Sequence, residues 1–125
     1  MSTRATILLA EDNSDTREAI AQVLAVEGYT VITAVHGKQA LEQLQAGLRP
    51  ALILLDLMMP VMDGWEFRKA QLGEPALAAI PVVLISAHDE VARAGTALHA
   101  AGVVRKPVDI EEMLRTIEAL CLRTN

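Results

Sequence analysis

The sequence is poor in cysteine, in aromatic residues and in positive charge. Its 125 residues include one cysteine, Cys121, and one each of Trp, Tyr and Phe. A single cysteine excludes an internal disulfide framework and suits a reducing compartment, so we expect a cytoplasmic protein with a packed thiol. The formal net charge is -5, which argues against a nucleic-acid partner bound through a basic surface.

Long apolar runs are also missing, although 52% of the residues are hydrophobic. No run approaches the roughly 20 residues that a membrane-spanning helix needs. The first apolar run, 7–10, is interrupted by Glu11 and Asp12, and is too short and too acidic for a signal peptide. We therefore expect no membrane partner. Without a linker or an internal repeat, the length fits one domain with its own core.

Short apolar runs alternate with segments of helical spacing. Continuous apolar runs are typical of strands that are covered on both faces. Such runs predict strands at 5–10, 51–56, 82–85 and 102–105, and the β-rich stretch at 29–34 predicts a fifth. Helical spacing predicts helices at 14–27, 37–46, 65–72, 90–101 and around 110–120, and we expect 73–81 to be a loose connection. This alternation predicts an α/β fold with a parallel sheet and helices on both faces.

The predicted strands end in residues that can do chemistry. Glu11 and Asp12 follow the first strand, Asp56 ends the third, Ser86 follows the fourth and Lys106 the fifth. The carboxyl ends of parallel strands share one edge, so these side chains should meet in one crevice. Three crowded acids repel each other, and Mg²⁺, which prefers oxygen ligands, would relieve that repulsion. A carboxylate beside cations is equipped for phosphoryl transfer.

In this order, these residues resemble the receiver domain of two-component response regulators, over almost the whole chain. The matching motifs are Glu11-Asp12, Asp56-Leu-Met-Met-Pro-Val-Met-Asp-Gly64, Ser86-Ala87 and Lys106-Pro107. The resemblance implies a (βα)5 flavodoxin-like three-layer sandwich with strand order 2-1-3-4-5. It also implies a single receiver domain over 1–125, of the stand-alone chemotaxis type, and we expect no output domain.

The resemblance assigns a role to each acid. Asp56 would be the phosphoacceptor. Asp12 and Asp56 would bind Mg²⁺ directly, together with the backbone carbonyl of Met58, while Glu11 would act mainly through water.

It also assigns roles to the ends of the last two strands. Ser86 would bond a phosphoryl oxygen, and Lys106 would pair with the phosphoryl group or with Asp56. The peptide bond between Lys106 and Pro107 would be cis.

The implied function is that of a phosphoacceptor switch, not of an enzyme beyond its own phosphorylation and dephosphorylation. Its phosphoryl donor would be a sensor histidine kinase or a histidine phosphotransfer protein, and it would act on a further, downstream protein. The chain itself would be a monomer or a weak dimer. Two alternatives stay open: a relay that passes the phosphoryl group onward, and a degenerate scaffold. A haloacid-dehalogenase-type phosphatase is disfavoured, because Met58 stands where such enzymes usually carry a second acid.

One position departs from the family pattern. Receiver domains commonly carry Tyr or Phe three residues before the lysine, and this chain has Val103 there. A valine cannot swing as a ring does. We therefore expect the response to run through the helix at 90–101, with a partner surface at Val91, Ala94 and Leu98 and the adjoining edge of the last helix.

Overall fold

The computed structural model describes the backbone of residues 4–123 and the side chains of residues 4–87 and 93–121. Its centre is a parallel five-stranded sheet in the order β2-β1-β3-β4-β5. The strands are β1 (Thr6–Ala10), β2 (Thr30–Ala34), β3 (Leu52–Asp56), β4 (Val82–Ala87) and β5 (Gly102–Lys106). The predicted fold and strand order are confirmed.

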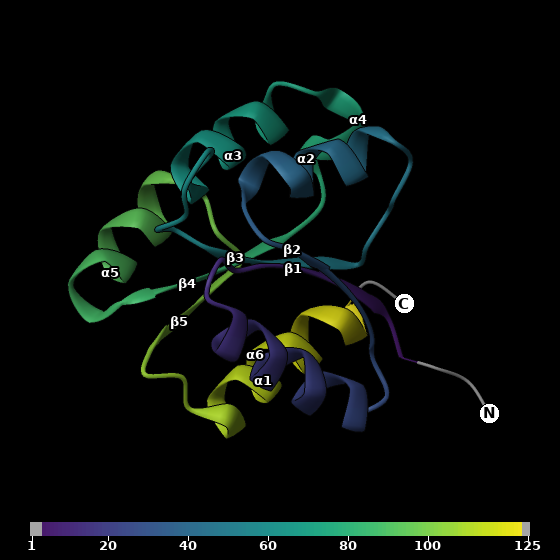
Figure 1. Ribbon diagram of the computed structural model, residues 1–125, viewed down its shortest axis with the longest axis vertical. Helices are drawn as coiled ribbons and strands as arrows, with labels where there is room; N and C mark the ends of the chain where they lie inside the picture. Colours follow the sequence, from purple (N-terminus) through teal and green to yellow (C-terminus); the bar gives the residue numbers. More distant parts are fainter. Residues whose placement is uncertain (1–3, 124–125) are drawn as a thin grey trace.

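Helices cover both faces of this sheet. They are α1 (Ser14–Val26), α2 (Gly37–Gln45), α3 (Gly64–Leu72), α4 (Pro75–Ala78), α5 (His88–Ala97) and α6 (Ile110–Arg123). With the sheet seen edge-on, α2, α3 and α5 lie on one side of it and α1 and α6 on the other (Figure 1). None of the helices in the described residues combines the length and the apolar character needed to cross a membrane.

The sheet divides the core in two. On the side of α2, α3 and α5, Leu8 and Ile53 pack with Phe67, while on the side of α1 and α6, Ile7 and Leu52 pack with partners that include Cys121. Every residue of β3 is buried, at 0% exposure up to Leu55. Burial on both faces explains why this strand is a continuous apolar run rather than an alternating one. The packed thiol at Cys121 is confirmed, at 7% exposure.

The connection from 73 to 81 is not loose, so the prediction for it is wrong. It forms the short helix α4, with Pro75 at its start, where the missing N–H of proline costs nothing. The Gln71 side chain of α3 fixes this connection, since its Nε2 donates to the carbonyls of Leu77 at 2.9 Å and Ile80 at 3.0 Å. The Leu77 side chain is 1% exposed.

The predicted partner surface on α5 is wrong at Ala94, and Leu98 is only partly exposed. Ala94 is fully buried, and Leu98 packs against the core below it; the side chain of Val91 lies outside the described residues. The reason is that α5 turns its small side chains inward and lies close to β5. A Cβ built on Gly95 would be only 2.9 Å from Val103 Cγ1.

The loop between β3 and α3 is pinned at both ends. The Gly64 N–H donates to the Leu57 carbonyl at 2.9 Å, and the Gly37 N–H of α2 donates to the Met62 carbonyl at 3.0 Å. Between these points the Met62 N–H bonds the Pro60 carbonyl at 2.7 Å. That bond closes a γ-turn on Val61, whose φ of 68° is strained for a β-branched residue. The loop therefore has a fixed shape beside the end of β3.

Candidate functional site

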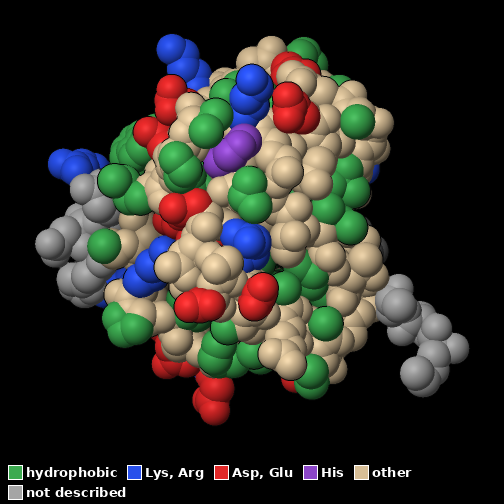
Figure 2. Space-filling view, in the orientation of Figure 1, with side chains coloured by type: hydrophobic (Ala, Val, Ile, Leu, Met, Phe, Trp, Pro, Cys, Tyr) green, Lys and Arg blue, Asp and Glu red, His purple; other side chains and the backbone are tan. Residues whose placement is uncertain are grey.

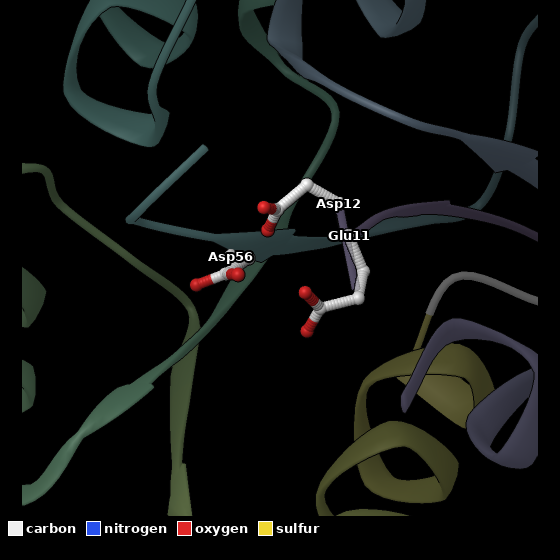
Figure 3. Close-up of side chains that lie close together, drawn as sticks. All are labelled: Glu11, Asp12 and Asp56. Atoms are coloured by element: carbon white, nitrogen blue, oxygen red, sulfur yellow. The ribbon is translucent and has the colours of Figure 1, made fainter. Parts of the chain in front are cut away.

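Three carboxylates meet at the carboxyl edge of the sheet, as predicted. Glu11 and Asp12 follow β1 and Asp56 ends β3, and one oxygen of each lies within 4.8 Å of the others. Figure 3 shows the three side chains projecting from two strand ends toward one shared space. An all-oxygen cluster of this kind is the donor set that hard divalent cations such as Mg²⁺ prefer.

Glu11 is the most deeply buried of the three, with 0% exposure. Its Oε2 accepts a hydrogen bond from the Asn13 N–H at 3.1 Å, and its Oε1 lies 3.1 Å from Lys106 Nζ in an ion pair. Burial, and next the neighbouring Asp56, raise the pKa of the Glu11 carboxyl above its usual range. The pocket thus holds a carboxylate whose charge Lys106 compensates only in part.

Lys106 bridges the two buried acids. Its Nζ donates to Asp56 Oδ2 at 3.3 Å while it pairs with Glu11. Burial by itself lowers the pKa of Lys106, but Asp56 and Glu11 outweigh that effect, so the pKa is raised overall. The peptide bond from Lys106 to Pro107 is cis, as the resemblance implied. The lysine therefore remains a cation within reach of both acids.

Asp56 itself is 2% exposed and is oriented by two donors. Lys106 binds its Oδ2, and the Met58 N–H donates to its Oδ1 at 3.2 Å. The Met58 side chain points outward and is 67% exposed. The backbone of Met58, the residue predicted to bind the metal through its carbonyl, thus contacts Asp56, while its side chain is exposed to solvent.

Ser86 lies on the strand beside Asp56, one residue beyond Ile85, which pairs with Asp56 across the ladder. Its side chain is 1% exposed, and its Oγ has no hydrogen-bond partner among the described residues. A buried hydroxyl without a partner costs about 1–3 kcal/mol. The group is therefore available to a ligand oxygen that enters the pocket.

Arg17 is a residue at this site that sequence reasoning missed. Its Nη1 donates to the backbone carbonyls of Glu11 at 2.9 Å and Asp12 at 3.3 Å. The available signal was its position as the fourth residue of α1, because a cation near the start of a helix opposes the helix dipole. Asn13 caps this helix, since its Oδ1 accepts from the Thr16 N–H at 2.9 Å.

A groove of about 330 Å³ opens next to Lys106. One wall belongs to α1, and the other to the segment that joins β5 to α6. Its lining includes Thr16, Ala19, Ile20, Pro107, Val108 and Ile110. The groove is mainly apolar and leads to the charged pocket through the lysine.

Comparison with known proteins points to one family. The model of the response regulator receiver domain matches residues 7–118. Among curated proteins, response regulator MprA of Mycobacterium ulcerans is 37% identical over 120 residues, covering 94% of this chain and 50% of the relative. MprA of Mycobacterium tuberculosis is 35% identical, with 94% and 51% coverage. The chain thus spans about half the length of the curated relatives that it matches.

Solved structures agree with the fold. Chemotaxis response regulator CheY4 of Vibrio cholerae superimposes with a TM-score of 0.85 at 32% identity, covering 94% of this chain and 99% of that one. The receiver domain of Francisella response regulator 1452 gives a TM-score of 0.87 at 26% identity, with 97% and 99% coverage. Together with the sheet order and the acids at its carboxyl edge, these matches show that the chain belongs to the family of response regulator receiver domains.

Proposed function

We propose that this chain is a phosphoacceptor switch, in which Asp56 takes a phosphoryl group from a phosphohistidine donor. One observation carries the proposal. Asp56 is a buried carboxylate held by Lys106 and crowded by two further acids. Such crowding is costly for the fold alone, and it suits a site that receives a cation and a phosphoryl group.

The chemistry balances with the groups present. A carboxylate oxygen of Asp56 attacks the phosphorus of the donor, a P–O bond forms, and the P–N bond breaks with its electron pair moving to the imidazole nitrogen. Lys106, already 3.3 Å from Asp56 Oδ2, offsets charge on the phosphoryl oxygens. The unpartnered Ser86 Oγ donates a hydrogen bond to one of them. Attack of water on the acyl phosphate later releases phosphate and restores the carboxylate.

The residues of the pocket fit Mg²⁺. Three carboxylates offer oxygen ligands within 4.8 Å of each other, and Asp12 keeps one side of the cluster open to solvent, which suits an ion that retains several waters. Asp12, Asp56 and the Met58 carbonyl would hold the ion, with Glu11 acting through water. When bound, Mg²⁺ would neutralise charge on the transferred phosphoryl group.

The donor is a sensor histidine kinase or a histidine phosphotransfer protein, and it docks in the groove beside Lys106. Support comes from the position of that groove, which joins an apolar wall on α1 to the charged pocket. Ile110, which lines the groove, is 39% exposed and so presents apolar surface to a partner. On the face drawn in Figure 2, acidic, basic and hydrophobic side chains are interspersed rather than gathered into one field, so contact there depends on local shape.

Two other roles are weighed against this one. A relay that passes the phosphoryl group onward would use the same pocket and the same groove. A scaffold would need neither the bridge from Lys106 to the buried acids nor the buried Ser86 hydroxyl. We propose no turnover of external substrates, because a second acid is lacking at Met58.

Mass spectrometry after incubation with acetyl phosphate and Mg²⁺ tests the proposal. The wild type should gain one phosphoryl group, Asp56→Asn should gain none, and Asp15→Asn, on the exposed start of α1, should behave as wild type. Label that persists in Asp56→Asn would contradict the assignment. Turnover of p-nitrophenyl phosphate would favour a phosphatase instead.

A further inference from the structure

We infer that Arg17 is a positioning residue for the metal-binding acids, acting through the backbone of Glu11 and Asp12. The inference rests on the proposed function, because it concerns how the same pocket binds Mg²⁺. Its basis is the pair of hydrogen bonds from Arg17 Nη1 to the carbonyls of Glu11 and Asp12, at 2.9 and 3.3 Å.

The segment from Glu11 to Asn13 is held from several directions. The Glu11 N–H donates to the Ala34 carbonyl at 3.1 Å, which ties the segment to the end of β2. The Glu11 carboxylate accepts from the Asn13 N–H. The two carbonyls left over, those of Glu11 and Asp12, both accept from Arg17. The guanidinium therefore bonds both peptide planes of the segment. The plane between Asp12 and Asn13 is also held by the Asn13 N–H, whereas the plane between Glu11 and Asp12 has, in the described part of the chain, only the bond from Arg17.

Asp12 depends on this support more than the other acids do. Glu11 and Asp56 are buried, and each is bonded through its own carboxylate. Asp12 is exposed, and no hydrogen bond to its carboxylate occurs within the described residues. Its direction toward Asp56 is thus set mainly by its backbone. A peptide turned away from Arg17 would carry the Asp12 carboxylate out of the cluster.

Charge alone predicts the opposite effect. A guanidinium near the cluster repels Mg²⁺, and a cation near the start of α1 opposes the helix dipole. If Arg17 acted only through its charge, its removal would tighten metal binding. If it acts by holding the carbonyls, its removal loosens metal binding. The sign of the change separates the two.

Calorimetric titration with MgCl₂ at constant ionic strength tests the inference on the whole chain. We expect Arg17→Met to weaken Mg²⁺ binding about ten-fold, as is typical when a group that orients metal ligands is lost. Arg17→Lys keeps the charge and one possible donor, so its affinity for Mg²⁺ should lie between those of the wild type and Arg17→Met. Glu18→Gln, the next residue along α1, serves as the matched control and should bind as wild type. Thermal melts in EDTA show whether each variant is folded.

A kinetic readout separates positioning from general damage. With acetyl phosphate as donor, which bypasses the groove at Thr16 and Ala19, Arg17→Met should need more Mg²⁺ for half-maximal phosphorylation yet reach a similar rate at saturation. Unchanged or tighter binding in Arg17→Met, beside a wild type that binds Mg²⁺, overturns the inference alone. A wild type that binds no Mg²⁺ overturns both this inference and the proposed metal site.

Discussion

Gly95 of α5 faces Val103 of β5 so closely that a Cβ at position 95 would lie 2.9 Å from Val103 Cγ1. A Cβ contact below 3.0 Å forces a neighbour to move. The valine takes the place where receiver domains commonly carry an aromatic ring, and the glycine lets the helix settle onto it. A ring at position 103 would require α5 to lie farther from the sheet.

This contact predicts how Gly95→Ala behaves. Alanine should favour the helix by about 1 kcal/mol, but the clash with Val103 should cost about 1–3 kcal/mol, so we expect net destabilisation. In a Val103→Ala background the clash disappears, and the same change should stabilise the protein. A double-mutant cycle by urea denaturation measures the coupling. Equal effects of Gly95→Ala in both backgrounds would show that the contact is not tight.

The raised pKa of Glu11 predicts a dependence of stability on pH. Because burial and Asp56 raise this pKa above its usual 4.5, the folded state binds the proton more tightly than the unfolded state does. The contribution of Glu11 to the free energy of unfolding therefore falls as pH rises above 4.5, and the loss is complete above the folded pKa. Glu11→Gln cannot titrate there.

Urea melts in EDTA across this range compare the two proteins. The stability of Glu11→Gln relative to wild type should increase with pH through that window. A difference that is constant, or that shrinks as pH rises, would contradict the pKa shift.

Mg²⁺ should stabilise the folded chain, because the acid cluster exists only in the folded state. At ten times its dissociation constant the ion should add about 1.4 kcal/mol to the free energy of unfolding. Asp12→Asn should lose most of this gain, yet it should be at least as stable as wild type in EDTA, since one like charge is removed. Melts with and without MgCl₂ at matched ionic strength check both. An Asp12→Asn variant that still gains the full stabilisation would place the ion elsewhere.

Arg68 predicts a large loss of stability on substitution. This arginine of α3 is 5% exposed, and it donates to the carbonyls of Leu98 at 3.0 Å and His99 at 3.2 Å and to Gln71 Oε1 at 2.8 Å. Burial lowers its pKa, and its partners are neutral oxygens, two of them just after the end of α5 and one on α3. We expect Arg68→Met to cost about 2–4 kcal/mol, because hydrogen bonds from a charged donor are lost and buried acceptors stay unpaired.

Lys69→Met is the matched control, because Lys69 follows Arg68 on the same helix and is exposed. This substitution should change the free energy of unfolding by less than about 0.5 kcal/mol. Hydrogen exchange should also rise at residues 98–100 in the Arg68 variant. A variant as stable as wild type would mean that water replaces the guanidinium at these carbonyls.

The sheet and the pocket could be predicted from the sequence because both follow from local patterns. A strand buried on both faces must be a continuous apolar run, as in β3, and a polar residue that ends such a run must lie at the edge of the sheet. Asp56 and Lys106 therefore came together as expected, although 50 residues separate them.

Features that depend on distant side chains could not be predicted in this way. The short helix α4 has too few residues to show periodicity, and Gln71 bonds the carbonyl of Leu77 within it and that of Ile80 just after it. The close packing of α5 on the sheet depends on Gly95, which lies opposite Val103 of β5. Arg68 bonds the carbonyls of Leu98 and His99, which lie 30 and 31 positions farther along the chain. Bonds between such distant residues leave no pattern in the local sequence.

The pinned loop between β3 and α3 limits how this chain can change in length. Its ends are tied by the bond from Gly64 to Leu57 and by the bond from Gly37 to Met62, and a Cβ on Gly64 would lie 2.7 Å from the Asp56 carbonyl. An inserted residue would have to displace β3, α2 or α3. The turn at Gly47 is different, since nothing lies within 4 Å of a Cβ built there. Insertions, tags and new chain ends therefore belong at Gly47, where exposed backbone tolerates them.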